Sequence, residues 1–354
     1  MSRPVALIIG ITGQDGSFLA ELLLARGYAV HGLRRRTSVP NLGNLAALVS
    51  GGADLHLHHG DLTEGASLLR VLQRVRPDEV YNLAGMSLPA GRAPQSAAAL
   101  HALGTQRLLD ALRLHDPGRR IRLFQGSSFE IFGPGGSAPV DEAAGFAPDS
   151  PAGVARLQAF WMIAAARERH GMHASTGIAF PHASARAAPD ALLRHIARGV
   201  VSCAAPTHSF GAAPTHAFGA APPVTLGALG RAQHWGHARD HAEAAWRILQ
   251  QPEPGDLVLA GGPVHPLRHV VERAFALAGM PLLWQGEGWA ETGLCSASGR
   301  VLVRLDPAAP ACRGPLGDDA LARRRLGWEP GTDLDALLAE ILADERAALA
   351  RRTA

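Results

Sequence analysis

Two side chains that can hold or move a proton stand two residues apart near the middle of the chain. Ser128 and Glu130 follow Arg122 to Gln125, a stretch that is typical of a buried strand. Polar groups just beyond the carboxyl end of a strand lie where open α/β sheets bind ligands. A hydroxyl and a carboxylate in such a crevice suit proton transfer. Local hydrogen bonding of a turn explains the pair equally well, so both interpretations stay open.

A second chemical signature lies near the N-terminus. Five apolar residues, Val5 to Ile9, are followed by Gly10, Gly13 and Gly16 and then by apolar residues at helical spacing, up to Leu23. Strand, glycine turn and helix together present backbone N–H groups and a helix N-terminus to a pyrophosphate. Glycines alone also mark ordinary turns, but here the strand and the helix that the motif requires are both present. The stretch predicts dinucleotide binding.

An arginine run follows the second expected strand, Ala29 to Leu33. Arg34, Arg35 and Arg36 stand where the adenosine ribose of a bound dinucleotide should lie. An acidic residue there would bind the 2′-hydroxyl of NAD, whereas arginines suit the 2′-phosphate of NADP. A solvated basic loop is the alternative. The run favours NADP as the cofactor.

The next two expected strands end in small or polar residues. Leu55 to His59 carries three histidines, but no cysteine or carboxylate completes a ligand set, so no metal site is predicted. Glu79 to Leu83 is followed by Ala84 and Gly85, whose small size would let a nicotinamide ribose approach the strand ends. Close packing is the alternative explanation for those two residues.

Composition limits the class of protein. The 354 residues are 47% apolar, which supports a full core, and the formal net charge of +3 gives no case for nucleic acid binding. Cys203, Cys295 and Cys312 have no paired spacing, which fits a reducing cytoplasm better than a disulfide framework. We expect neither a signal peptide nor a membrane helix, because the N-terminus enters a strand at once and no long apolar span follows.

Strand and helix patterns alternate along the chain and predict an α/β fold. We expect a Rossmann-type doubly wound parallel sheet over residues 1–178, to which residues 235–262 return, and a smaller substrate lobe that is interleaved in sequence over 179–354. An eight-residue repeat between Ala204 and Gly219 predicts a mobile loop within residues 203–223. The expected helices are Ser67–Val75, Ala97–Leu114, His241–Gln250, Leu267–Ala278 and Leu334–Leu349.

Several motifs, in order and over nearly the whole chain, resemble those of the GDP-mannose 4,6-dehydratases, which are extended short-chain dehydrogenase/reductases. The matching stretches are Gly10–Ser17, His31–Arg36, Gly60–Thr63, Tyr81–Ala84, Gly104–Asp110, Ser127–Glu130, Ser150–Pro151, Trp235–His237 with Asp240, and Leu326–Trp328.

The resemblance implies an internal redox cycle that turns GDP-mannose into GDP-4-keto-6-deoxymannose. NADP takes a hydride from C4 of the hexose while a Tyr removes the O4 proton. A Glu then removes the C5 proton, water leaves from C6, and the hydride returns to C6. Ser128 falls at the position of the Ser or Thr that binds O4, and Glu130 falls at the position of the Glu.

The chain departs from the family at the remaining catalytic pair. After Ser150-Pro151 the family reads Tyr-Gly-x-x-Lys, whereas here Ala152 and Arg156 occupy the Tyr and Lys positions. A methyl group has no proton to exchange, and arginine is not an isosteric replacement for lysine. The two tyrosines of the chain, Tyr28 and Tyr81, stand elsewhere in the sequence and are not expected to substitute.

The resemblance also implies binding residues. In the substrate lobe, Pro181 replaces a family Asn beside His182, and His195 replaces a Lys, so we expect anionic GDP-sugar to bind more weakly. The implied cofactor-binding residues are Gly10, Thr12, Gly13, Gln14, Asp15, Gly16, Arg35, Arg36, Asp61, Leu62, Leu83, Ala84, Gly85, Arg156 and His182.

Two classes of function remain. The chain is either an NADP-dependent sugar-nucleotide enzyme, acting on GDP-mannose or on an already oxidised 4-keto sugar nucleotide, or a catalytically silent relative that binds cofactor or pairs with subunits. Relatives pair through helices that match Ala97–Leu114 and Pro151–His170, so a homodimer or homotetramer is expected. On the second helix, Phe160, Trp161, Ile163 and Ala164 are the residues expected to cover a partner helix.

Overall fold

The computed structural model describes residues 3–35, 42–85, 94–118, 120–136, 138–205 and 221–353. The chain forms two compact units, each built from three segments. Unit 1 comprises Met1–His182, Gly236–Gly261 and Gly314–Gly331, and unit 2 comprises Ala183–Trp235, Gly262–Arg313 and Thr332–Ala354. The sequence analysis did not anticipate the third segment of unit 1, because its one helix, α10 (Ala320–Leu326), is too short to show a periodic pattern.

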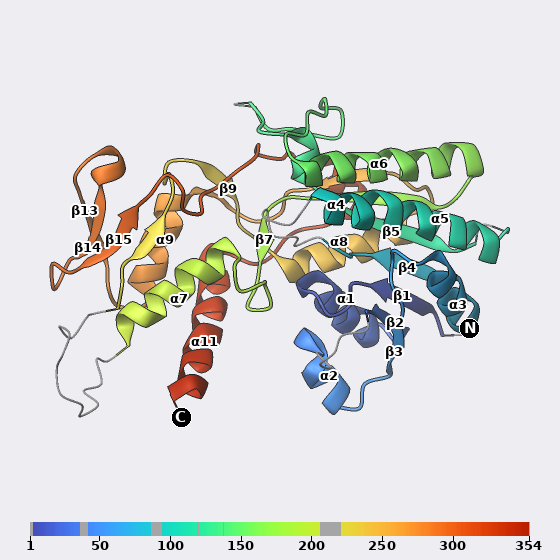
Figure 1. The fold of residues 1–354 in the computed structure, drawn as a ribbon, viewed down its shortest axis with the longest axis horizontal. Coiled ribbons are helices and arrows are strands. Elements are labelled where there is room, and N and C mark those ends of the chain that lie inside the picture. The colour runs from blue at the N-terminus through green and yellow to red at the C-terminus, as the bar shows by residue number, and fades with distance from the viewer. Residues whose placement is uncertain are drawn as a thin grey trace. The chain divides into compact units, whose positions relative to one another are not determined.

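Unit 1 is organised around a sheet in which the described residues form seven strands, all paired in parallel, in the order β11-β6-β5-β4-β1-β2-β3 (Figure 1). This arrangement confirms the expected Rossmann-type sheet. The strands are β1 (Val5–Ile9), β2 (Ala29–Arg34), β3 (Leu55–His59), β4 (Glu79–Asn82), β5 (Arg122–Ser128), β6 (Ala174–Ala179) and β11 (Asp256–Leu259).

Helices cover both faces of this sheet, as a doubly wound fold requires. Because side chains alternate along a strand, Ala6 and Ile8 of β1 face one core while Leu7 and Ile9 face the other. The first core is closed by α1 (Gln14–Ala25), α8 (Ala238–Gln250) and α10. The second is closed by α3 (Gly65–Val75), α5 (Gly104–His115) and α6 (Pro151–His170).

Strand β5 extends three residues beyond the predicted end at Gln125. Gly126, Ser127 and Ser128 stay in the ladder because they pair with Gly177, Ile178 and Ala179 of β6. Strand β6 was not among the predicted strands, since its Ser175, Thr176 and Gly177 interrupt any apolar run. Ser128 therefore lies at the end of the sheet itself rather than in the loop that follows.

The helix expected at Ala97–Leu114 is helical but not uniform. It consists of α4 (Pro94–Ala97), a π-helical turn η2 (Ala98–Leu103) and α5. The wider turn brings both Leu100 and His101 against Gly85, where a Cβ would lie 2.6 Å from Leu100 Cδ2 and 2.8 Å from His101 Cε1. Such π-turns are frequent at functional sites.

Helix α6 presents Arg156 to the interior. Its N-terminus is fixed by Ser150, whose hydroxyl accepts a hydrogen bond from Gly153 N at 3.0 Å, with Pro151 in the first turn. Trp161 is 56% exposed. Phe160, Ile163 and Ala164 are buried within unit 1. The expectation that all four cover a partner was therefore wrong for these three.

Unit 2 contains, within the described residues, a four-stranded sheet of order β13-β14-β15-β8 against which helices pack. The expected helix at 334–349 extends to residue 353. The repeat predicted to form a mobile loop lies, from residue 206 onward, outside the described residues. The elements of unit 2 are α7 (Leu192–Ala204), β8 (Val224–Leu226), β9 (Ala232–His234), β12 (Val264–Pro266), α9 (Leu267–Leu277), β13 (Leu282–Gln285), η4 (Gly288–Ala290), β14 (Thr292–Cys295), β15 (Val301–Leu305) and α11 (Leu334–Thr353).

None of the helices described by the structure has the length and apolar character of a membrane span.

The remaining elements are short. The short elements are η1 (Gly43–Leu45), α2 (Ala46–Ser50), η3 (Phe129–Phe132), β7 (His182–Ala183) and β10 (Gly236–His237).

Candidate functional site

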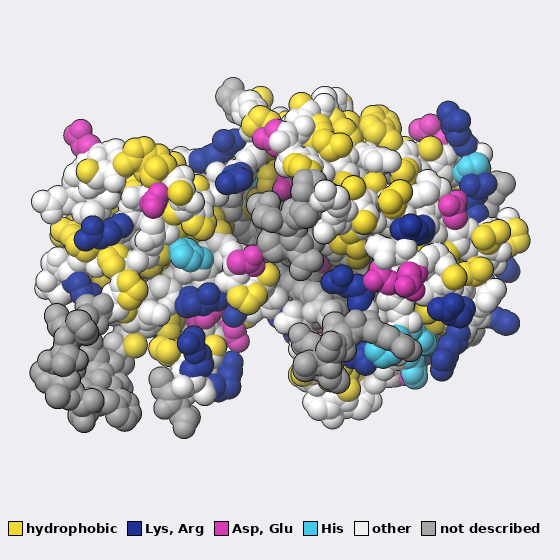
Figure 2. Space-filling view, viewed as in Figure 1, with side chains coloured by type: hydrophobic (Ala, Val, Ile, Leu, Met, Phe, Trp, Pro, Cys, Tyr) yellow, Lys and Arg dark blue, Asp and Glu magenta, His cyan; other side chains and the backbone are white. Residues whose placement is uncertain are grey.

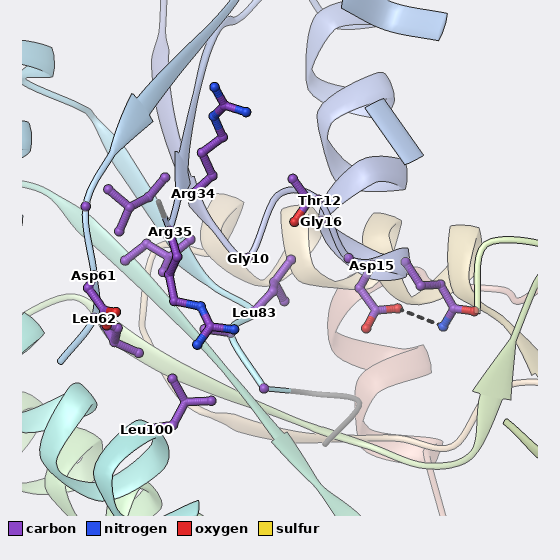
Figure 3. A pocket seen from close by; sticks show the side chains of 17 residues that line it. Gly10, Thr12, Asp15, Gly16, Arg34, Arg35, Asp61, Leu62, Leu83 and Leu100 are labelled. Atoms are coloured by element: carbon purple, nitrogen blue, oxygen red, sulfur yellow. Dashed lines mark hydrogen bonds between the residues drawn. The ribbon is translucent and has the colours of Figure 1, made fainter. Parts of the chain in front are cut away.

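A pocket of about 270 Å³ opens in unit 1 at the carboxyl ends of the parallel strands (Figure 3). Most of the predicted cofactor-binding residues line it. Arg156 and His182 are not among its lining residues, and Arg36 lies outside the described residues. The predicted residues that line the pocket are Gly10, Thr12, Gly13, Gln14, Asp15, Gly16, Arg35, Asp61, Leu62, Leu83, Ala84 and Gly85.

Glycines make the floor of this pocket possible. Gly10 has φ +87°, and a Cβ there would lie 2.9 Å from the carbonyl carbon of Leu83. A Cβ on Gly16 would lie 2.4 Å from the carbonyl oxygen of Gly10. Only glycine allows the turn to approach both β4 and the start of α1 so closely. The cradle leaves the N-terminus of α1, with its partial positive charge, facing the pocket.

The arginines divide between two directions. Figure 3 shows the Arg35 side chain extending among Asp61, Leu62 and Leu83, whereas Arg34 extends the other way. Asp61 is turned toward its own loop, where Oδ1 accepts hydrogen bonds from Thr63 N and Oγ1, both at 2.8 Å. The Nε of Arg34 is buried and, among the described residues, has no hydrogen-bond partner. The Arg35 guanidinium beside the glycine cradle suits an anionic group.

Ser128 and Glu130 make the local turn that the sequence analysis kept as an alternative. Ser128 caps the short helix η3 by accepting a hydrogen bond from Glu130 N at 3.2 Å, and its hydroxyl also lies 3.4 Å from Glu130 Oε2. The Glu130 side chain remains 34% exposed. The pair is thus held at the end of β5 by its own hydrogen bonds.

Arg156 changes the chemistry of that pair. Its side chain is 5% exposed, its Nη1 forms an ion pair with Glu130 Oε2, and its Nη2 donates to the Gly85 carbonyl at 3.0 Å. Burial lowers the pKa of Arg156 to about 10, so the guanidinium stays charged at neutral pH. Ala152 lies one turn earlier on the same helix. The Glu130 carboxylate therefore faces a fixed cation, which makes it a weaker proton acceptor.

Sequence reasoning missed His101. This side chain is 3% exposed, and its Nε2 has no hydrogen-bond partner among the described residues. Burial, together with the nearby charge of Arg156, lowers the pKa of His101 to about 3, so the ring is neutral. A lone histidine in an apolar helical stretch was the only signal for it.

Asp15 and His182 form a second charge pair in unit 1. Asp15 Oδ1 lies 2.8 Å from His182 Nε2, and the two side chains are 9% and 10% exposed. His241 of α8 stacks on His182 with ring centroids 4.0 Å apart. His182 thus reaches the pocket through Asp15 rather than by lining it. No sequence pattern pointed to His241.

Elsewhere in the described part of the chain, no group of three or more His, Cys, Asp or Glu side chains is placed to hold a metal ion.

The parallel sheet with a glycine turn after β1 and a polar crevice beyond β4 and β5 has the Rossmann-type fold of the short-chain dehydrogenase/reductases. Solved structures share this fold. A dTDP-glucose 4,6-dehydratase from Bacillus anthracis in complex with NAD has a TM-score of 0.76 at 16% identity and covers 97% of each chain. A Thermus thermophilus UDP-glucose 4-epimerase complexed with NAD has a TM-score of 0.75 at 18% identity, covering 97% of this chain and 99% of the other.

Sequence comparison gives the family. The model for GDP-mannose 4,6 dehydratase matches residues 7–341. The chain is 38% identical to a GDP-mannose 4,6-dehydratase from Sinorhizobium fredii, covering 97% of both, and 36% identical to a human GDP-mannose 4,6 dehydratase, covering 96% of this chain and 91% of the relative. The chain belongs to the GDP-mannose 4,6-dehydratase family, which confirms the resemblance.

The buried ion pair can be tested through stability. Glu130→Gln leaves the Arg156 guanidinium buried without a counter-charge, so we expect the free energy of unfolding to fall by about 2 kcal/mol. Adding Arg156→Met to Glu130→Gln should restore most of that loss, because neither charge then remains. Urea denaturation of the single and double variants measures both effects.

Arg273→Gln is the matched control. It removes one partner of the ion pair Arg273–Asp335, in which the two side chains are 39% and 48% exposed. The free energy of unfolding should change much less than it does in Glu130→Gln, because an exposed ion pair contributes little to stability. Equal effects of Glu130→Gln and Arg273→Gln would contradict a buried Arg156 that depends on Glu130 for its counter-charge.

Proposed function

We propose that this protein binds NADP(H) and a nucleotide sugar but does not carry out the dehydration cycle of its family. The observation that carries the proposal is the ion pair of Arg156 with Glu130, one turn beyond Ala152 on α6. The cycle needs a base at the Ala152 position and a carboxylate free to take the C5 proton. A general base contributes roughly 10²- to 10⁴-fold in rate, and here one base is replaced and the other is tied to a cation.

Cofactor binding is supported by the pocket. The glycine cradle and the N-terminus of α1 suit a pyrophosphate, and the Arg35 side chain suits the 2′-phosphate of NADP. Structural relatives hold NAD. When bound, the cofactor would supply reversible hydride transfer. The residues of this chain would bind and orient it.

A nucleotide sugar is the ligand that the names of the relatives suggest, GDP-mannose in particular. We infer weak binding of its phosphates. His195, at a family Lys position, is engaged within unit 2, where its Nε2 lies 3.0 Å from the Thr225 carbonyl oxygen. An imidazole ring held by a backbone carbonyl is a poorer phosphate ligand than a mobile ammonium group.

The same ion pair weighs against an enzyme that acts on a 4-keto sugar nucleotide. Removing a proton beside an existing carbonyl would require the Glu130 carboxylate as the base, and that carboxylate is paired with Arg156. We therefore favour a catalytically silent, cofactor-binding relative. A reducing, cytoplasmic setting is supported by Cys203, Cys295 and Cys312, which are all free thiols.

The cofactor assignment makes a direct prediction. Titration calorimetry should show binding of NADP with a lower Kd than NAD. Arg35→Ala should weaken NADP binding by about tenfold or more, because a charged contact to the 2′-phosphate is lost, and should leave NAD almost unchanged. Arg70→Ala, an exposed arginine on α3 outside the pocket, is the control and should change neither. Preference for NAD in the unaltered protein would contradict the assignment.

A second prediction concerns activity. The unaltered protein should give no GDP-4-keto-6-deoxy sugar from GDP-mannose by mass spectrometry. Ala152→Tyr with Arg156→Lys should raise turnover by about 10²-fold or more, since it supplies the base and removes the fork that holds Glu130. Ala152→Phe with Arg156→Lys supplies the ring without its hydroxyl and should stay inactive. Full dehydratase activity in the unaltered protein would refute the proposal.

Self-association is also proposed, through the outer surface of η2 and α6. Leu103 of η2 and Val154 and Trp161 of α6 are each at least half exposed, and exposed apolar side chains on neighbouring helices are typical of an interface. Light scattering should give a mass of two or more chains, and Trp161→Arg with Val154→Arg should reduce it. Leu283→Arg, an equally exposed apolar residue in unit 2, should leave the mass unchanged. A monomer at micromolar concentration would contradict this.

A further inference from the structure

An acidic side chain lies in the turn that should receive a pyrophosphate. Asp15 is in the first turn of α1 and lines the pocket, and its Oδ1 accepts hydrogen bonds from His182 Nε2 at 2.8 Å and from Gln14 Nε2 at 3.3 Å (Figure 3 draws the contact with Gln14). A carboxylate there competes with a bound phosphate for the partial positive charge of the helix N-terminus and repels it. Its charge therefore needs compensation.

The two hydrogen-bond contacts of His182 require a cationic ring. Its Nε2 faces the Asp15 carboxylate and its Nδ1 faces the Phe180 carbonyl, each at 2.8 Å. Both partners are acceptors only, so only the doubly protonated imidazolium satisfies both contacts. Burial opposes the charge, but the interaction with Asp15 outweighs it and raises the pKa of His182 above its ordinary value.

Of the two stacked rings, His182 and His241, one carries a positive charge. His241 stacks on His182 with ring centroids 4.0 Å apart, and its own ring nitrogens lie 3.2 Å from the carbonyl oxygens of His237 and Leu259. These contacts are longer than the two 2.8 Å contacts of His182, which favours the second proton on His182. Burial and the charge of His182 lower the pKa of His241 to about 3. The other charged or titratable groups on β10 and α8 are His237, Arg239, Asp240, Glu243 and Arg247. His237 and Arg239 pack against the Phe18 ring, Glu243 pairs with Arg247, and Oδ2 of Asp240 is buried without a hydrogen-bond partner among the described residues. The positive charge of the stack is therefore placed on His182 rather than on His241.

We propose that His182 is a positioning residue that acts through Asp15, whose negative charge its imidazolium cancels in the phosphate-binding turn, so that affinity for the dinucleotide depends on pH. The inference rests on the proposed cofactor binding. It assigns to His182 a role beyond contact with the cofactor, and to His241 the role of fixing which ring is protonated.

The direction in which affinity for the dinucleotide changes with pH follows from the net charge of the Asp15–His182 pair. Below the raised pKa of His182 the pair is neutral, and the pyrophosphate faces the helix N-terminus alone. As the pH rises through that pKa, the Asp15 carboxylate is left uncompensated and repels the cofactor. One unpaired charge a few ångströms away changes affinity by on the order of tenfold. By reciprocity, bound cofactor should raise the pKa of His182 further.

Titration calorimetry with NADP between about pH 7 and 9.5 tests this, because the 2′-phosphate is already ionised over that range. The Kd of the unaltered protein should rise by about tenfold with pH. His182→Gln should bind NADP weakly, with a Kd that does not change with pH. Asp15→Asn should have the same Kd at both ends of the pH range. His115→Gln, at the end of α5, is the control and should keep the dependence of the unaltered protein.

NMR titration of the imidazole signals gives a readout without cofactor. The pKa of His182 should lie above its ordinary value and fall toward it in Asp15→Asn. Binding with the same pH profile in His182→Gln as in the unaltered protein, or an ordinary His182 pKa, would overturn the inference while leaving the proposed function intact. No binding at any pH would contradict cofactor binding itself, and this inference with it.

Discussion

A buried guanidinium is the constraint on which the candidate site depends. Arg156 points into unit 1 from α6, and its charge persists at neutral pH, so the surrounding groups must compensate it. They do so with the carboxylate after β5 and the carbonyl of Gly85 after β4. The ends of two neighbouring strands are thereby joined through one side chain. The carboxylate of Glu130 is part of that connection.

Unit 1 contains a second ion pair, in which a histidine compensates a carboxylate. At the glycine turn, a carboxylate rather than a cation lies at the binding surface, and a histidine supplies the opposite charge from behind it. An arginine is charged at any physiological pH, whereas a histidine changes its charge close to that range. The pair at the crevice is therefore permanent and the pair at the pocket can respond to pH. Both lie at the carboxyl edge of one parallel sheet, where ligands of such folds bind.

Because the chain belongs to the GDP-mannose 4,6-dehydratase family, its differences from the family pattern can be compared with what binding and catalysis each require. In a chain 38% identical to a relative over 97% of both, the glycine cradle is kept, and Ala152 and Arg156 stand at the positions where the resemblance implies the catalytic Tyr and Lys. Binding and catalysis place separate demands on a site, because binding needs shape and charge whereas proton transfer also needs a group of suitable pKa. A member of the family can therefore lose proton transfer and keep binding.

The sequence by itself determined the parts of this protein that depend on local pattern. The apolar run of β1, the glycine turn and the helix after it predicted the Rossmann-type sheet. The resemblance to the GDP-mannose 4,6-dehydratases implied that Ala152 and Arg156 stand at the family's Tyr and Lys positions. Only the tertiary structure decided that Arg156 pairs with Glu130 and that His241 stacks on His182. These partners are far apart in the chain, and their contacts arise where parallel strands bring distant segments to one edge, which no periodicity along the sequence records.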